Sequence, residues 1–335
     1  MVAMVLLRLD TAIVIDPMDD SKVTATKVLE GVTYKVDTDG QLFRVNKNGR
    51  WAYVEAMLQP HKMRAAFEED NGVVYRVDRD DGRRFRTRNR LSDGFEKLPI
   101  GISGLRELIS PKRGWGSISL QSPKAPKPED SRALSTQILA EGGAFRDASV
   151  APDDTRAQAG IRALRCATPP PYRGMLTCQS SLTSPLLYFK KGDDFWFRAY
   201  YFVEDALPAA IMSLECPWLT NKGELRLVLD KEGHLTVELT CWNKPKYRQS
   251  NETAIAFPTG RWVKVNAHFH FSDTEQGIIQ IWQDDQLIID TTGSTLALPD
   301  IFYSSLEIGI TAHSNAEHAC TVWVDQVLVA DQRIH

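Results

Sequence analysis

The chain has 335 residues, and its 40 lysines and arginines against 43 aspartates and glutamates leave a formal charge of −3. This balance provides no overall basic field, which argues against a nucleic-acid-binding protein. No uninterrupted apolar run approaches the ~18 residues of a membrane-spanning helix. The five cysteines contain no Cys-x-x-Cys pair, so they fit neither a zinc site nor a disulfide framework. The length favours two domains over one.

The first 17 residues are apolar, but Arg8 and Asp10 interrupt them and no basic segment precedes them. A secretory signal has a basic segment followed by an unbroken apolar one, so this stretch is better explained by a strand or two. If Met1 is the native start, we expect synthesis in the cytoplasm without a signal peptide. A place in a virion or an extracellular assembly is compatible with that expectation.

A weak duplication follows. Residues 31–40 are echoed by residues 72–82, and Phe43-Arg44 recurs as Phe85-Arg86. Each copy alternates apolar and polar residues up to an Asp-Gly pair and then resumes, which is typical of a β-hairpin. We predict a small β domain over residues 1–105, made of two related hairpin units and serving attachment or oligomerisation. The segment 37–40 could hold calcium, although the later acidic residue of an EF-hand loop is missing and a turn explains the segment better.

Prolines mark the next boundary. Pro123, Pro126 and Pro128 lie within nine residues and predict an extended, semi-rigid linker over residues 106–131. Residues 132–335 then form the second domain. About ten short strands are expected there, the first at residues 134–139, with turn residues between them and no helix of ten residues or more. This pattern predicts an all-β protein with a jelly-roll β-sandwich.

The outward positions of these strands carry an unusual mixture of side chains. Alternation places Trp196, Arg198 and Tyr200 on one side of their strand, opposite inward phenylalanines. Flat rings can cover the C–H face of a sugar, and amide, guanidinium and imidazole groups can bond its hydroxyls. The predicted glycan-binding residues are therefore Trp196, Arg198, Tyr200, Trp242, Asn266, His268, Gln280 and Trp282. The alternative is that these aromatics only fill sheet edges, since Trp and Tyr favour strands anyway.

Four stretches resemble one superfamily. They are residues 192–200, 257–265, 279–286 and 322–327. The second contains the Pro-x-Gly-x-Trp entry to a long strand, and the third is similar to a Val-Trp-x-Asp-Gly hairpin with Gln286 in place of the glycine. Over about residues 133–335 the chain thus resembles the concanavalin A-like lectin/glucanase superfamily, especially its laminin-G-like and polysaccharide-lyase-like branches. The resemblance implies a jelly roll, but that fold hosts binders, hydrolases and lyases. The N-terminal region resembles no family.

Two enzymatic functions are alternatives to binding. A retaining glycosidase of that superfamily needs paired carboxylates on one strand, and no Glu-x-Asp-x-x-Glu pattern occurs, with Glu215 and Glu238 isolated. A polysaccharide lyase needs a base and a group that neutralises a uronate carboxylate. The strands Gln-x-His and Tyr-x-Lys-x-Gly-x-Tyr of alginate lyases are not present as such. If the protein is a lyase, the candidate residues are Arg198, Tyr200, Lys264, His268 and His270.

These observations favour a non-catalytic, lectin-like carbohydrate-binding protein over an enzyme. Its expected partner is a polysaccharide or surface glycan, and its expected setting is adhesion or attachment within a larger assembly such as a virion appendage. The N-terminal domain would make it a homo-oligomer or join it to that assembly. A lyase acting on a uronic-acid glycan and a purely structural or decoration protein are the alternatives. No cofactor is required, and calcium or a metal held by the two histidines stays open.

Overall fold

The computed structural model describes the chain in segments, with side chains described from Phe67 onward. The described residues are 14–15, 23–29, 32–37, 42–45, 51–54, 65–78, 82–172, 175–216, 224–240, 246–297 and 301–334. Within these segments neither helix has the length and apolar character needed to cross a membrane. Trp242 of the predicted glycan-binding set and most of the segment 37–40 considered for calcium lie outside the described residues.

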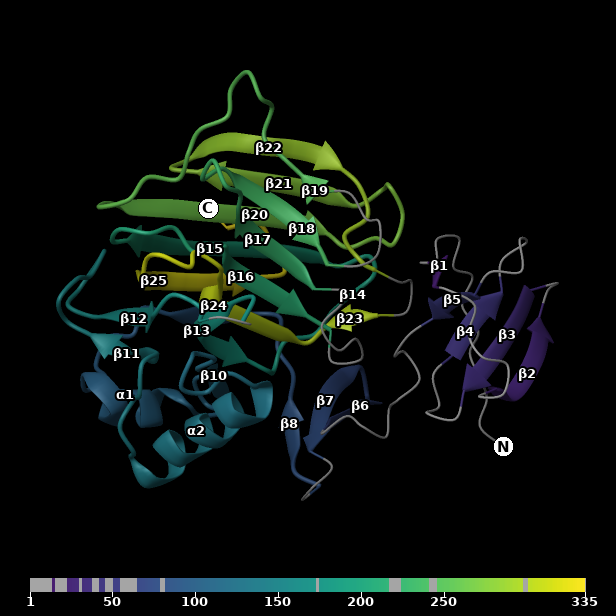
Figure 1. Ribbon diagram of the computed structural model, residues 1–335, viewed down its shortest axis with the longest axis horizontal. Helices are drawn as coiled ribbons and strands as arrows, with labels where there is room; N and C mark the ends of the chain where they lie inside the picture. The colour runs from purple at the N-terminus through teal and green to yellow at the C-terminus, as the bar shows by residue number, and fades with distance from the viewer. Residues whose placement is uncertain are drawn as a thin grey trace.

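Two antiparallel sheets face each other and form a jelly-roll β-sandwich, which confirms the predicted fold class (Figure 1). The seven-stranded sheet has the order β10 (Ser117–Ser119), β13 (Cys178–Ser184), β24 (Ser305–His313), β16 (Ala210–Glu215), β17 (Leu225–Leu229), β18 (Leu235–Leu239) and β19 (Lys246–Tyr247). The eight-stranded sheet has the order β11 (Ser149–Asp153), β12 (Ala163–Thr168), β25 (Cys320–Ala330), β15 (Asp194–Val203), β20 (Trp262–His270), β21 (Ile278–Gln283) and β22 (Gln286–Thr292), with β9 (Leu91–Asp93) also paired to β25.

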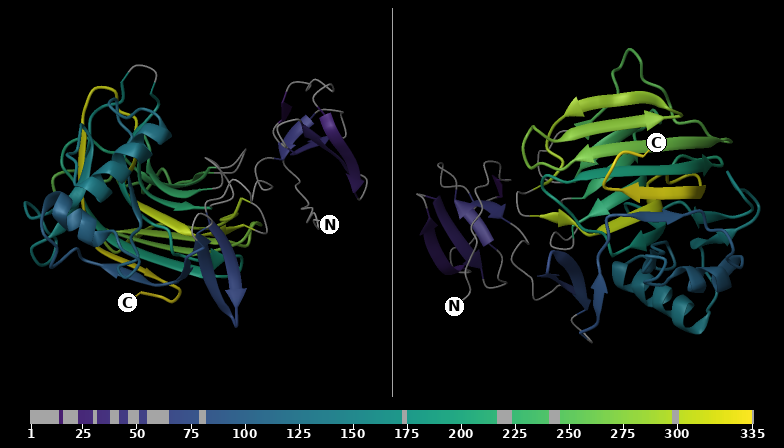
Figure 2. Two further views of the ribbon diagram at one scale, coloured as in Figure 1. Left: turned by 90° about the horizontal axis from the view of Figure 1, so that it is seen from below. Right: turned by 180° about the vertical axis from the view of Figure 1, so that it is seen from behind.

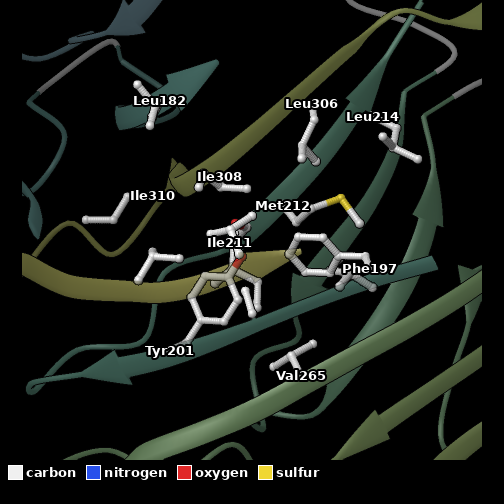
Figure 3. Packing of buried hydrophobic residues seen from close by; sticks show 14 of the residues in the cluster. Leu182, Phe197, Tyr201, Ile211, Met212, Leu214, Val265, Leu306, Ile308 and Ile310 are labelled. Atoms are coloured by element: carbon white, nitrogen blue, oxygen red, sulfur yellow. Dashed lines mark hydrogen bonds between the residues drawn. The ribbon is translucent and has the colours of Figure 1, made fainter. Parts of the chain in front are cut away.

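The core lies between the two sheets. From the eight-stranded sheet, Phe195, Phe197 and Tyr201 point inward and are fully or almost fully buried. They meet the inward residues of β16 and β24, among them Met212 and Ile308 (Figure 3). The Tyr201 hydroxyl donates a hydrogen bond to the carbonyl of Ile211 across the core, at 3.2 Å. Buried and partly exposed residues alternate from Asp194 to Tyr201, as the period-2 analysis predicted, and the last two residues of β15 are both buried.

The predicted hairpins are confirmed, and each belongs to a three-stranded meander. In the first copy β2 (Val23–Leu29), β3 (Val32–Asp37) and β4 (Leu42–Val45) pair in sequence order. With β1 (Val14–Ile15) and β5 (Trp51–Val54) they make a five-stranded sheet. In the second copy β6 (Ala65–Asp70), β7 (Val73–Asp78) and β8 (Arg84–Arg86) form a separate three-stranded sheet.

The second meander packs directly on the sandwich. The ring of Phe67 on β6 lies 4.9 Å from Phe302 and 6.2 Å from Tyr188, measured between centroids. Phe302 belongs to β23 (Phe302–Tyr303), and Tyr188 directly precedes β14 (Phe189–Lys190), which pairs with β23. Residues from the predicted first domain therefore contribute to the sandwich, as β9 also does through its pairing with β25.

Residues 106–131 do not form the extended linker that their prolines predict. They include the end of helix α1 (Gly101–Leu108), strand β10 and the start of helix α2 (Pro128–Glu141), as Figure 2 shows beside the sandwich. The strand expected at residues 134–139 is also wrong, because these residues lie inside α2. Pro128 occupies the first turn of α2, where a missing N–H costs nothing. Asp130 accepts the N–H of Lys127, and Gly142 ends the helix in the left-handed region at φ 74°.

Trp115 shows how firmly this segment is packed. Its side chain is fully buried, and its indole Nε1 donates a hydrogen bond to Asp93 Oδ2 at 2.9 Å. We expect Trp115→Ala to lower the free energy of unfolding by about 3–5 kcal/mol, because it leaves a large cavity and removes one hydrogen bond to the buried Asp93 carboxylate. Urea denaturation measures this. Lys124→Ala, an exposed change in the same segment, is the control and should stay within about 0.5 kcal/mol of the wild type. Equal urea midpoints for the two variants would contradict the buried packing of Trp115.

Candidate functional site

The outward face of the eight-stranded sheet collects the predicted glycan-binding residues in cross-strand rows. Trp196 on β15 lies directly opposite His268 on β20, which lies opposite Gln280 on β21. Residues directly opposite one another in an antiparallel sheet point to the same side. These three side chains therefore form one row on the outward face.

A second row runs beside the first. Arg198 lies opposite Asn266, and Asn266 lies opposite Trp282. One step further along β15, Tyr200 lies opposite Lys264. Seven of the eight predicted glycan-binding residues thus share one face of one sheet, and Trp242 is the residue outside the described part of the chain. The five residues named for a lyase lie on this same face.

The aromatic rings of these rows are stacked. The rings of Trp196 and His268 are nearly parallel, at 8°, with centroids 3.9 Å apart. Trp282 lies on another side of Trp196, with a centroid distance of 6.1 Å and an angle of 23°. His268 is buried, so one member of the stack is enclosed by the protein.

Hydrogen bonds fix the imidazole as well. His268 Nδ1 is 2.9 Å from Gln280 Oε1, and His268 Nε2 is 2.9 Å from Asp194 Oδ1. The same carboxylate oxygen lies 3.3 Å from His270 Nδ1. Gln280 in turn donates from Nε2 to Asp290 Oδ1 at 3.0 Å. Both ring nitrogens of His268 are therefore engaged within the protein.

A hollow of about 190 Å³ opens between these rows. Its floor and walls combine aromatic, amide and cationic groups from three adjacent strands, and residues following β25 close one side. The lining residues include Trp196, Arg198, Lys264, Asn266, Trp282, Asp285, Arg333 and Ile334. We refer to Trp196, Asn266, His268, Gln280 and Trp282 as the aromatic face.

The opposite sheet holds a second cleft that the sequence analysis missed. It has a volume of about 600 Å³ and lies between the outward face of the seven-stranded sheet and helix α2. Glu215 on β16, Glu224 just before β17 and Glu307 on β24 line it. Glu215 and Glu238 are thus not isolated as the sequence suggested, since Glu215 lies near Glu307 and Glu238 pairs with Lys246 at 2.8 Å.

Two carboxyl groups in this cleft share a hydrogen bond. Glu307 is almost fully buried and also accepts a hydrogen bond from the Ser181 hydroxyl. Burial raises the pKa of Glu307 to about 7, while burial and the Glu307 charge together raise the pKa of Glu215 well above its ordinary value. Carboxyl groups in direct contact are closer than the ~5 Å of a retaining glycosidase pair. Arg226, 3.6 Å from Glu224, provides a compensating charge.

His268 and His270 on β20 are the histidines that the sequence offers as metal ligands. Among the described residues, no group of three or more histidine, cysteine, aspartate or glutamate side chains is placed to hold a metal ion.

Comparisons with known proteins were made for the sequence and for the structure. No protein-family description and no curated protein matches the sequence. Similar solved structures include the cellulose-induced protein Cip1, with 16% identity, a TM-score of 0.48, and coverage of 73% of this chain and 98% of that one. An endo-β-1,4-glucuronan lyase from the fungus Trichoderma reesei has 12% identity, a TM-score of 0.38 and coverage of 56% and 88%. The alginate lyase Aly36B has 8% identity, a TM-score of 0.42 and coverage of 74% and 99%.

At these identities and TM-scores, the similarities establish neither a family nor an activity for this chain. Its function has to be argued from the two surfaces of the sandwich.

The carboxyl pair predicts a pH-dependent stability. Since the pKa of Glu307 is higher in the folded protein than in the unfolded chain, the folded state binds more protons, and stability falls as the pH rises from about 5 to about 8. Glu307→Gln removes the ionising group, so the decline in melting temperature over this range should become shallower. Thermal unfolding at several pH values measures it, with the exposed Glu252→Gln as control. If the melting temperature falls equally with pH in the wild type and in both variants, the raised pKa of Glu307 is contradicted.

Proposed function

We propose that the protein is a non-catalytic carbohydrate-binding protein and that its glycan lies on the aromatic face of the eight-stranded sheet. One observation supports this proposal above all. The hollow beside Trp196 and Trp282 is lined by Arg198, Lys264 and Asn266, so that apolar rings and hydrogen-bonding groups meet around a single ring-sized space.

The chemistry of a sugar ring matches this lining. One face of a pyranose exposes C–H groups that pack on an indole, while its rim carries hydroxyl groups that need donors and acceptors. The ring of Trp196 stacks on His268, and the imidazole of His268 is hydrogen-bonded to Gln280 and Asp194. A surface that is already rigid before binding loses little conformational entropy when the glycan arrives. This supports binding over a purely structural role.

The hydrogen bonding around the histidines favours a binder over a lyase. A lyase base must be able to take a proton from the substrate. Both nitrogens of His268 are engaged, His270 Nδ1 faces Asp194, and Lys264 Nζ is paired with Asp285 at 2.8 Å. Three of the five groups named for a lyase thus already have partners within the protein.

We also propose that the N-terminal region attaches this binding domain to a larger assembly, as a homo-oligomer or through another component. An adhesive role in a virion appendage or an extracellular assembly would use such an arrangement. Multi-angle light scattering of the full chain and of residues 65–335 tests the oligomeric part. We expect a mass above that of the monomer for the full chain, and a monomeric full chain would contradict the oligomeric part.

Trp282 provides the direct test of glycan binding. We expect Trp282→Ala to weaken retention on a glycan array about ten- to thirty-fold, the effect of removing a central aromatic contact. Trp282→Phe keeps a ring and should retain most of the binding. Tyr172→Ala removes an exposed aromatic elsewhere on the protein and is the matched control. Equal retention by wild type and Trp282→Ala would place the glycan elsewhere.

Incubation with polygalacturonate and alginate separates binder from lyase. Elimination at a uronate produces an unsaturated sugar that absorbs in the ultraviolet, and we expect no time-dependent rise. A known alginate lyase serves as the positive control. A steady rise that His268→Ala abolishes would overturn the non-catalytic assignment.

A further inference from the structure

A large groove of the sandwich adjoins the aromatic face and is strongly cationic. It has a volume of about 1000 Å³ and is formed by the segment around β9, by the residues after α1 and by the end of the chain beyond β25. Six cationic residues line it, against the two acidic residues Asp93 and Glu107. The cationic residues are Arg88, Arg90, Lys112, Arg113, Arg198 and Arg333. A chain with a net charge of −3 thus concentrates a surplus of four positive charges in one groove.

Asp93, one of the two acidic residues of the groove, offsets one of its six cations. Asp93 is buried and accepts hydrogen bonds from the Phe95 N–H and from Trp115 Nε1, at 2.8 and 2.9 Å. Arg113 lies 3.7 Å from this carboxylate and is the cation that it pairs with. The carboxylate of Asp93 is therefore committed to the fold of the segment around it.

At the rim the cations face solvent. Lys112 and Arg333 are exposed, and neither forms a hydrogen bond or ion pair with another residue that the structure describes. Arg90 is held in place by Asp331, 3.2 Å away, while 63% of its side chain remains exposed. These groups can contact an anion without first breaking a buried ion pair.

The groove continues into the hollow of the aromatic face. Arg198, Arg333 and Ile334 line both. The strand register gives the same continuity, because Ser92, Leu328, Arg198, Asn266 and Trp282 form one straight cross-strand row. From β9 to β21 this row crosses four interstrand spacings of ~4.8 Å, about 19 Å in all, which is room for several sugar units.

We propose that this cationic groove binds the acidic groups of an anionic polysaccharide, which then crosses the strands along this row and places a sugar ring against Trp282. The inference rests on the proposed function and adds the ligand class and its direction on the sheet. Guanidinium groups bind carboxylate or sulfate with two parallel hydrogen bonds, which a neutral sugar cannot offer. Single-stranded nucleic acid would need a series of exposed rings, and here His268 covers one face of Trp196.

Binding is measured by calorimetry with alginate as a polyuronate, chondroitin sulfate as a sulfated glycan, dextran as a neutral glycan and single-stranded DNA. The test variant is Lys112→Gln/Arg333→Gln, which removes the two exposed cations without a described partner. The control is Lys124→Gln/Lys231→Gln, which makes the same change in net charge at exposed positions elsewhere. Trp282→Ala is included in every arm.

We expect alginate or chondroitin sulfate to bind at least tenfold more tightly than dextran. Because chondroitin sulfate carries both carboxylate and sulfate groups, the preference between them shows whether sulfate adds to the binding of carboxylate. The groove variant should lose about tenfold in affinity for the charged glycan and show a weaker salt dependence, whereas the control variant should bind as the wild type does.

Three results would overturn the inference. If dextran binds as tightly as the charged glycans and depends on Trp282, the groove has no role while the proposed function stands. If charged glycans bind equally well to the groove variant and its control, the cations do not contact the ligand. If single-stranded DNA binds more tightly than every glycan, the partner is a nucleic acid. A charged glycan that needs the groove but not Trp282 would instead confirm the anion site and overturn the aromatic-face assignment.

Discussion

The pairing register of β15 with β20 decides what both surfaces of the eight-stranded sheet present. Nine residue pairs, from Asp194 with His270 to Phe202 with Trp262, lock these strands together. Burial of Phe195 and Phe197 in the core stabilises this register, because a slip by one residue would bring their neighbours Trp196 and Arg198 into the sandwich. The hydrophobic core therefore positions the outward side chains without contacting them.

This coupling explains why so much of the candidate site could be predicted from the sequence. Alternation alone assigned Trp196, Arg198 and Tyr200 to one side, since a strand has only two sides. It could not say that Asn266 would lie between Arg198 and Trp282, because sheet order depends on long-range pairing. The turn residues and short strands were sufficient for the fold class, and the predicted hairpins required only Asp-Gly pairs and local alternation.

The failures have equally specific causes. Three prolines suggested an extended linker, but Pro128 occupies the helical position where proline is tolerated, and its neighbours supply a cap. Over so short a stretch, apolar residues at 134, 138 and 139 fit either a strand or a helix. Only the signals that end a helix, such as Gly142, distinguish the two. Glu215 and Glu307 come from strands far apart in the sequence. The only sequence signal for this carboxyl pair was a polar residue at an outward position of each strand, and such residues are common on any sheet.

The composition also gave no indication of the cationic groove, because net charge is a sum over the whole chain. A bound ligand responds to the local charge instead. At physiological ionic strength, charges more than ~8 Å away are largely screened, so a ligand in the groove responds to Lys112, Arg198 and Arg333 rather than to the −3 of the whole chain. The cleft on the other sheet is mixed in charge, because Glu215, Glu224 and Glu307 line it together with Arg76 and Arg132. A weak overall field excludes long-range steering by net charge, but it says nothing against a charged partner that binds in contact with one face.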